Sequence, residues 1–299
     1  MKFLIVGAGA LGTIYAAHLA RAGHDVTLMA RGERAAHLAA NGMRVSGEAS
    51  FTARCRVLIQ PDTITDTDVV VIAVKTYDTA AALQPLINLG TGSAFSVQNG
   101  VLKNGQLAGV VGEHATLGAV GMLGGEVMPL RAGQPCEVRY LMPGATIIGE
   151  RDGSDSDRVS RLVGAMTDAG LNARASREIT TVEWAKFVSW SGVSAVAVLT
   201  RLPTSRFLTD ADTALIAARV MRETAAVAEK SGITLPDSGM SGRIVTTGTE
   251  AQAVEALMAN GSRMSPDFRQ SILQDADRGK PLEVNETLGY TVALGAQLG

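Results

Sequence analysis

The first half of the chain alternates short, β-branched apolar runs with longer amphipathic segments. The runs predict β-strands at residues 2–6, 25–29, 69–74 and 94–97. Between the first two, residues 13–22 form an alanine-rich segment with helical periodicity. Strands that are apolar on both faces and separated by helices are typical of a parallel sheet covered by helices on both sides. The pattern therefore predicts a doubly wound α/β domain.

The pattern changes twice further along the chain. Between about residues 110 and 150, short runs at 137–141 and 145–149 are joined by glycine and proline turns, which predicts an antiparallel extension of the sheet. A helix is predicted at 157–169, and after about residue 176 only helical periodicity remains. The helices predicted there span residues 179–200, 211–231, 250–260, 267–278 and 286–298. We expect an α/β domain over residues 1–175 and an all-α domain over residues 176–299.

Composition narrows the class of partner. The chain has 299 residues, 46% of them hydrophobic, and its 27 basic and 29 acidic side chains leave a net charge of −2. Such a chain has no broad positive field for nucleic acid or an anionic membrane, and no uncharged stretch suits a bilayer. Cys55 and Cys136 lie outside metal-ligand spacing, so we interpret them as buried thiols in a reducing, cytoplasmic compartment. A small-molecule partner and no bound metal are expected.

A glycine-rich turn follows the first predicted strand and opens the first predicted helix. Gly7, Gly9 and Gly12 have the spacing G-x-G-x-x-G, which in this context is typical of Rossmann-type dinucleotide-binding domains. The three glycines allow a tight turn, close approach of a pyrophosphate and packing of helix on strand, respectively. Backbone N–H groups at the helix start, including those of Ala10 and Leu11, would bind the anion. The alternative is a glycine turn that binds no ligand.

Polar side chains follow three of the predicted strands. Arg31 ends the second strand, where an acidic residue would accept a ribose 2′-hydroxyl and repel a 2′-phosphate. An arginine there suits the 2′-phosphate of NADP(H), and Arg34 lies close enough in sequence to assist. Lys75 and Asn99 follow the next two strands, at the sheet edge where ligands of such folds bind. The alternatives are a solvated arginine, a surface lysine and an ordinary turn residue.

Six segments, taken in order, carry a resemblance to a known family. They are GAGALG at the start, Arg31, VKTYD around Lys75, QNG at 98–100, EWAKF around Lys186, and SILQD followed downstream by Glu283. Together they resemble the 2-dehydropantoate 2-reductases, or ketopantoate reductases, which reduce a 2-keto acid with NADPH in pantothenate biosynthesis. The resemblance spans nearly the whole chain and implies an NADP-dependent oxidoreductase acting on CH–OH groups.

The resemblance also implies roles for three residues of the second half. Lys186 matches the family's catalytic lysine, Glu283 its glutamate, and Ser271 the serine that contacts the substrate carboxylate. An ammonium near the reacting ketone could stabilise and protonate the alkoxide that hydride transfer creates. Glu283 could orient that lysine or hold the product hydroxyl. A solvent-exposed helix lysine is the alternative for Lys186.

Three positions depart from what the resemblance implies. Lys186, Trp190 and Ser194 recur at i, i+4 and i+8 and so share one helix face. Related proteins are expected to carry substrate-binding asparagines at the second and third of these positions, and again at Thr204 after a proline. We therefore expect these three residues in the substrate pocket of a paralogue with an altered 2-keto acid, whose apolar or aromatic tail rests on Trp190. The alternative is that the indole is core between helices.

The leading hypothesis is an NADPH-dependent reductase of a small 2-keto acid, with its site in the cleft between the domains. A non-catalytic NADPH-binding or redox-sensing protein is the alternative from another class, although such a protein needs no proton donor. An oxidising dehydrogenase acting on a hydroxy acid or an amino-acid derivative is a third. The apolar character of residues 179–200 and 211–231 is compatible with a homodimer, and equally with burial inside the all-α domain.

Overall fold

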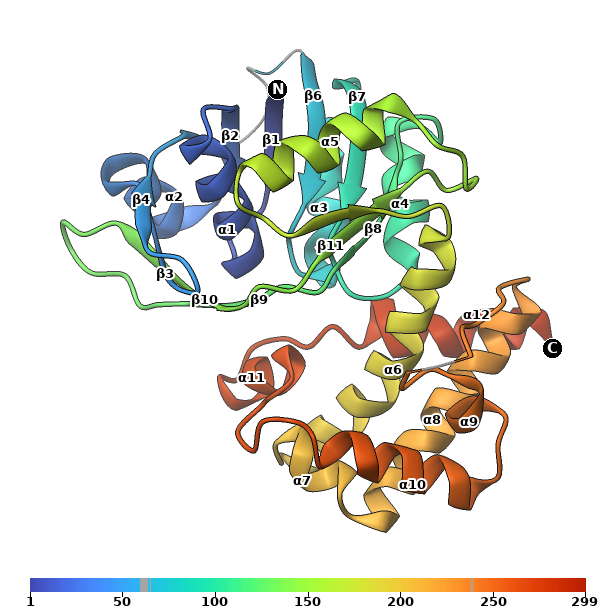
Figure 1. Cartoon of the computed structure of the whole chain (residues 1–299). Coiled ribbons are helices and arrows are strands. Elements are labelled where there is room, and N and C mark those ends of the chain that lie inside the picture. Colours follow the sequence, from blue (N-terminus) through green and yellow to red (C-terminus); the bar gives the residue numbers. More distant parts are fainter. Residues whose placement is uncertain (60–63, 65, 238) are drawn as a thin grey trace. The chain divides into compact units, whose positions relative to one another are not determined.

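The structure is a computed structural model that describes residues 1–59, 64, 66–237 and 239–299 (Figure 1). The chain divides into two compact units. The first unit comprises residues 1–98 and 103–179, and the second comprises residues 99–102 and 180–299. Each unit has a hydrophobic core of its own. The α/β character of the first unit and the helical character of the second confirm the predicted fold class.

The centre of the first unit is a five-stranded sheet in the order β5-β2-β1-β6-β7, with every neighbouring pair parallel. Its strands are β1 (Lys2–Val6), β2 (Asp25–Met29), β5 (Arg56–Leu58), β6 (Asp66–Ile72) and β7 (Gly90–Ser96). Phe3 and Ile5 of β1 enter one hydrophobic cluster, whereas Leu4 and Val6 enter another. Side chains that alternate between two buried faces explain why these strands are apolar throughout.

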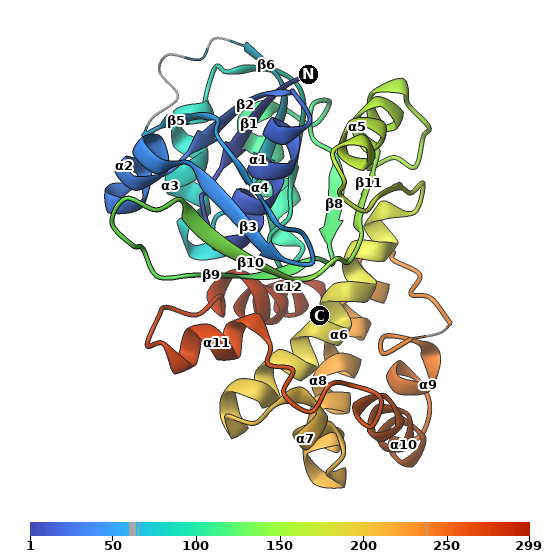
Figure 2. The ribbon, with the colours of Figure 1, turned by 60° about the vertical axis from the view of Figure 1, so that its left-hand side comes forward.

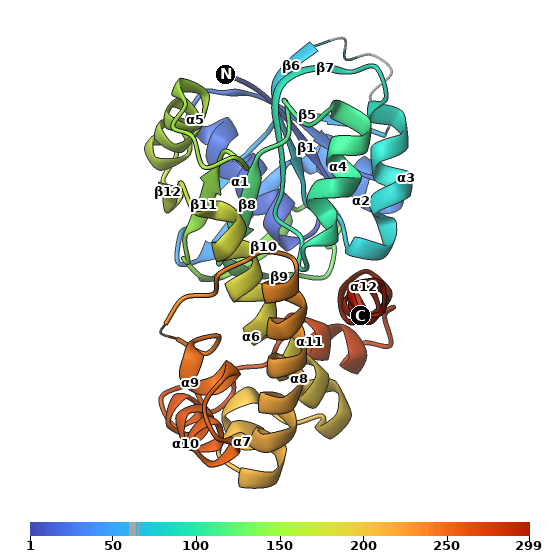
Figure 3. The same cartoon turned by 90° about the vertical axis from the view of Figure 1, so that its right-hand side faces the viewer.

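Helices cover both faces of this sheet. Helices α1 (Ala10–Arg21) and α5 (Asp157–Asp168) contribute apolar side chains to the cluster that holds Phe3 and Ile5. The opposite face is covered by α3 (Thr79–Leu83) and α4 (Leu102–Val111), which lie on the same side of the sheet in Figure 3. The remaining helical segments of the unit are α2 (Gly32–Asn41), η1 (Thr76–Asp78) and η2 (Gln84–Leu86).

Two smaller sheets replace the single antiparallel extension that the sequence predicted. One has the order β4-β3-β10-β9 and is built from β3 (Met43–Gly47), β4 (Phe51–Ala53), β9 (Gly124–Val127) and β10 (Cys136–Met142). The other has the order β12-β11-β8, with β8 (Gly118–Gly121), β11 (Thr146–Gly149) and β12 (Ala173–Ala175).

The prediction of an antiparallel extension was wrong in its pairing. Strand β10 pairs antiparallel with β9 but parallel with β3, far back in the sequence, and so lies in a separate sheet (Figure 2). Strand β8 pairs antiparallel with β11, and this sheet meets the edge of the large one through an isolated bridge between Ala94 and Thr116. Parallel pairing over a long sequence separation leaves no local signal, so strand periodicity alone could not find it.

The second unit consists of helices, with no strand among its described residues. These are α6 (Ile179–Thr200), α7 (Thr204–Leu208), α8 (Ala211–Lys230), α9 (Arg243–Thr246), α10 (Glu250–Gly261), α11 (Ser271–Asp277), the π-helical turn η3 (Asn285–Gly289) and α12 (Tyr290–Leu298). Helix α6 crosses α8 closely at Gly192, where a Cβ atom would meet the Ala217 carbonyl oxygen at 2.5 Å. Helix α10 packs against α8 and α9 (Figure 1).

Two predicted helices of this unit begin differently in the structure. The helix expected at 267–278 begins only at Ser271, because a turn in which Phe268 N–H donates to the Ser265 carbonyl precedes it. The helix expected at 286–298 opens with the π-helical turn η3, which the bond from Gly289 N–H to the Val284 carbonyl closes.

Within the described ranges, no helix combines the length and the apolar character needed to cross a membrane.

Candidate functional site

Glycine is needed at the three positions of the loop after β1 for different structural reasons. Gly7 has φ +109°, and a Cβ there would lie 2.7 Å from Val74 Cγ1. A Cβ on Gly12 would collide with the Gly7 carbonyl oxygen. Gly9 differs, since the nearest atom to its Cβ would be the Ala73 carbonyl oxygen at 3.9 Å. Packing within the chain thus requires the first and third glycines. The second glycine has no side chain that would keep a ligand away from the backbone at the start of α1.

The start of α1 is suited to an anion. Gly9 is its N-cap, no side chain caps the helix, and its first turn holds no acidic residue. The first helical bond runs from Thr13 N–H to the Gly9 carbonyl at 3.0 Å, so the N–H groups of Ala10 and Leu11 have no intrahelical acceptor. Such groups, together with the helix dipole, favour a phosphate. The predicted loop residues therefore fit a dinucleotide's pyrophosphate.

Arg31 follows β2, at the position where we expected a residue that binds the 2′-phosphate of NADP(H). It is the N-cap residue of α2, its side chain is 64% exposed, and its Nη2 lies 3.1 Å from Asp78 Oδ1. An ion pair between exposed side chains contributes little free energy, so Arg31 can exchange Asp78 for a phosphate. Asp78 belongs to η1, which begins directly after the half-buried Lys75 in the loop that follows β6. Arg34 does not join Arg31, because its Nε donates to the Ala8 carbonyl in the glycine loop at 2.5 Å.

Gln98, which the sequence analysis did not single out, holds the segment that carries Lys75. Its Nε2 donates to the Val74 carbonyl at 3.0 Å and to Thr79 Oγ1 at 2.8 Å. Its Oε1 accepts a bond from Ser96 Oγ at 2.8 Å. The end of β7 is thereby tied to the loop after β6. A glutamine just after a predicted strand was the available signal, and the sequence prediction named only its neighbour Asn99.

Three predicted site residues come together in the second unit. Lys186 Nζ donates to Asn99 Oδ1 at 3.2 Å, and Asn99 Nδ2 lies 3.5 Å from Glu283 Oε2. Lys186 is half-buried on α6, and Glu283, just before η3, is buried. The Asn99 amide thus bridges the ammonium and the carboxylate. Asn99 was expected at the cofactor, and the structure places its amide between the predicted reactive pair.

Local packing explains why Asn99 reaches this position. Gly100 has φ +83°, and a Cβ there would lie 3.2 Å from Thr287 Cγ2 in the π-helical turn. Thr287 Oγ1 in turn donates to the Glu283 carbonyl. The turn at residues 99–102 therefore packs against the same segment that presents Glu283. Glycine is needed here both for its backbone conformation and for this close approach.

The residues expected in the substrate pocket have unequal surroundings. Trp190 is buried in the helical core and stacks on Phe187, with ring centroids 6.2 Å apart. Ser194 Oγ is buried, and no hydrogen-bond partner for it lies among the described residues. Thr204 is also buried, and its Oγ1 accepts a bond from Gln270 Nε2 at 3.3 Å. Ser271 follows Gln270 as the exposed first residue of α11, so the structure brings Thr204 beside the start of that helix.

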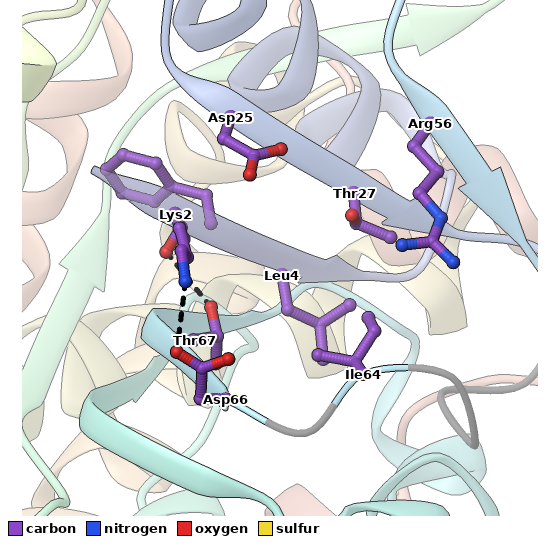
Figure 4. A pocket seen from close by; sticks show the side chains of 9 residues that line it. Lys2, Leu4, Asp25, Thr27, Arg56, Ile64, Asp66 and Thr67 are labelled. Atoms are coloured by element: carbon purple, nitrogen blue, oxygen red, sulfur yellow. Dashed lines mark hydrogen bonds and ion pairs between the residues drawn. The ribbon is translucent and has the colours of Figure 1, made fainter.

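A hollow of about 190 Å³, whose lining Figure 4 shows, lies at the amino ends of the strands of the large sheet, whereas the glycine loop follows the carboxyl end of β1. Lys2, Asp25, Arg56 and Asp66, from the beginnings of four parallel strands, contribute its charged lining. Lys2 Nζ faces Asp66 Oδ2 at 3.0 Å, and the two acids balance the two bases. Ligands of open parallel sheets bind at the carboxyl ends of the strands, so this hollow is no candidate for the cofactor.

Metal and thiol chemistry find no support in the residues described. No group of three or more His, Cys, Asp or Glu side chains in those ranges could hold a metal ion. Both cysteines are free, Cys136 is buried, and Cys55 is only half-buried rather than fully buried as expected. Burial raises the pKa of Cys55 to about 11. Its thiol is therefore protonated at neutral pH and is a poor nucleophile.

Comparison with known protein families shows to which family the chain belongs. The family described as ketopantoate reductase PanE/ApbA matches residues 3–153, and its C-terminal counterpart matches residues 178–299. The chain belongs to the ketopantoate reductase family. This confirms the resemblance that the six sequence segments indicated.

Individual proteins of this kind are similar over the whole chain. A 2-dehydropantoate 2-reductase of Archaeoglobus fulgidus is 29% identical over 295 residues, which are 99% of this chain and 91% of that protein. The crystal structure of a PanE/ApbA family ketopantoate reductase from Ralstonia eutropha has a TM-score of 0.82 at 27% identity and covers 100% and 93% of the two chains. A D-mandelate dehydrogenase in complex with NADH and anilino(oxo)acetate has a TM-score of 0.80 and covers 99% and 92%. At 16% identity, that last likeness concerns the fold alone.

Proposed function

We propose that this ketopantoate reductase family member is an oxidoreductase that uses NADPH to reduce a small 2-keto acid to a 2-hydroxy acid. The observation that carries the proposal is the bridge from Lys186 through Asn99 to Glu283. It holds an ammonium and a carboxylate on either side of one amide, and carbonyl reduction needs a proton donor such as this ammonium. The relatives named 2-dehydropantoate 2-reductase support the same reaction class.

Each residue of this bridge has a proposed task. When bound, the nicotinamide supplies the hydride. Lys186 Nζ donates a hydrogen bond to the substrate carbonyl oxygen and transfers its proton as negative charge develops there. Asn99 Oδ1 accepts one Nζ proton and so directs the others. Glu283 orients the Asn99 amide and accepts a hydrogen bond from the product hydroxyl. Ser271 binds the substrate carboxylate.

The cofactor residues are proposed in the first unit. The open side of Gly9 and the N–H groups of Ala10 and Leu11 bind the pyrophosphate. Arg31 binds the 2′-phosphate and so favours NADPH over NADH, because guanidinium and phosphate form charge-assisted bonds. Lys75 completes the cofactor site from the loop that follows β6. We assign cofactor binding to residues 1–175, and substrate binding and dimerisation to residues 176–299.

The substrate is proposed to carry an apolar or aromatic tail. The support is the position of Trp190, which is buried in the helical core but lies four residues from Lys186 on the same face of α6. Thr204 already accepts a bond from Gln270, which leaves it less free to read a polar substrate group. Exposed apolar side chains on three helices of the second unit support a homodimer, namely Leu199, Ile216 and Val292.

A steady-state assay that follows NADPH oxidation tests the proposal. Ketopantoate is compared with 2-keto acids that carry branched, apolar or aromatic tails, each with NADPH and with NADH. We expect turnover with NADPH and a preference for a tail larger than that of ketopantoate. Efficient use of ketopantoate alone would contradict the altered pocket. Binding of NADPH without turnover of any keto acid would contradict the enzymatic function and favour a non-catalytic binding protein.

A further inference from the structure

The position of Arg34 is unfavourable for a positive charge in two ways. It is the third residue of α2, where the helix dipole disfavours a positive charge. It is also half-buried, and none of the ion pairs among the described residues includes it. Burial lowers the pKa of its guanidinium, as expected for a charge without a nearby carboxylate. A half-buried charge without a carboxylate partner is costly, which points to a role that offsets the cost.

The contacts of Arg34 all lead to the glycine loop. Its Nε donates to the Ala8 carbonyl at 2.5 Å, and its Nη2 donates to Thr13 Oγ1 at 3.2 Å. Thr13 Oγ1 itself donates to the same Ala8 carbonyl at 3.3 Å. The third guanidinium nitrogen, Nη1, is buried and bonds to no described residue. Arg34 thus connects the turn after β1 with the first turn of α1.

These contacts fix a peptide plane that the ligand needs. The Ala8–Gly9 peptide is planar and trans, so its carbonyl and N–H point in opposite directions. Because Arg34 and Thr13 hold the Ala8 carbonyl, the Gly9 N–H is turned away from them. The missing side chain of Gly9 leaves open space beside this N–H, with the Ala73 carbonyl oxygen 3.9 Å from where a Cβ would lie.

We propose that Arg34 is a positioning residue for the cofactor's pyrophosphate. It orients the Gly9 N–H toward the anion, and its unpaired charge adds to the positive potential of the loop. The assignment rests on the proposed binding of NADPH but is separate from the role of Arg31. Arg31 contacts the 2′-phosphate, whereas Arg34 acts on the pyrophosphate through the Ala8–Gly9 peptide.

The test uses two probes that separate these phosphates. NADP⁺ contains both the pyrophosphate and the 2′-phosphate, whereas 2′-AMP contains only the latter. Calorimetric titration of Arg34→Met should show NADP⁺ affinity reduced about tenfold, since two hydrogen bonds near the loop are lost, with 2′-AMP affinity unchanged. In kinetics the KM for NADPH should rise by a similar factor while kcat stays constant. Arg34→Lys, which keeps the charge but not both bonds, should fall between wild type and Arg34→Met.

Arg54→Met is the matched control, because Arg54 also bonds a backbone carbonyl, that of Ala40 near the other end of α2, at 3.0 Å. It should bind both probes as wild type does. A folded Arg34→Met or Arg34→Lys variant with wild-type NADP⁺ affinity would overturn the assignment. So would equal loss of NADP⁺ and 2′-AMP, which indicates general damage to the unit. A wild-type chain that binds no NADP⁺ would refute the proposed function itself.

Discussion

Replacing Asn99 with alanine tests whether its amide positions the reactive lysine. The Asn99→Ala variant removes the acceptor of the 3.2 Å bond from Lys186 Nζ and the donor that faces Glu283 at 3.5 Å. The lysine then loses the acceptor that directs its ammonium, and two charged groups lose a shared partner. We expect slower reduction with little change in cofactor binding.

The size of the effect follows from the two bonds. A hydrogen bond to a charged group contributes about 1.5–3 kcal/mol, and the length of 3.2 Å places this one in the lower part of that range. The contact with Glu283 is longer and adds less. A loss of about 1.5–2 kcal/mol from the transition state reduces kcat about 10- to 30-fold.

The assay compares kcat and KM of wild type and Asn99→Ala for NADPH and for the preferred 2-keto acid. Asn260→Ala serves as the control, because it removes an amide whose Nδ2 bonds the Ala256 carbonyl within α10. That control should keep wild-type turnover. An Asn99→Ala variant with unchanged kcat would refute the bridge, and a defect confined to the KM for NADPH would return Asn99 to the cofactor site.

Three further predictions concern the first unit. Arg31→Asp should raise the KM for NADPH at least about tenfold while sparing NADH, because a carboxylate repels the 2′-phosphate; an unchanged cofactor preference would contradict the role of Arg31. Asp78→Asn should lower the KM for NADPH about two- to fivefold, since Arg31 no longer has to leave an ion pair, and a raised KM would show that Asp78 helps binding. His18 is buried between Phe51 and Tyr140, and burial lowers its pKa, so below pH 6.5 the unfolded chain binds a proton that the folded chain does not. In denaturant titrations, wild type should therefore lose unfolding free energy more steeply than His18→Phe as the pH falls through 6.5, and parallel curves would contradict this explanation.

Elements with strong periodicity could be predicted from the sequence. The strands at Lys2–Val6 and Asp25–Met29 and the helix at Ile179–Thr200 have the predicted ends. Helix α2 was missed although its buried residues Ala35 and Leu38 have helical spacing, so the signal was present in the sequence. Strands of three residues, such as β4 and β5, are too short to show alternation.

The candidate site was predictable in its residues and not in its contacts. The strand–turn–helix context predicted the glycine loop, and the family resemblance implied Lys186 and Glu283. That Asn99 lies between the first two depends on the turn packing against Thr287, a contact between distant segments. The bonds of Arg34 and Gln98 likewise depend on tertiary contacts, which no local pattern encodes.

Substitution of Lys186 tests the central claim most directly. The measurement is the kcat of Lys186→Ala for reduction of the preferred 2-keto acid at saturating NADPH, with NADPH affinity determined by titration of the same preparation. Loss of the proton donor should reduce kcat about 100-fold or more, while NADPH binds as it does to wild type. Wild-type turnover in this variant would contradict the proposed mechanism.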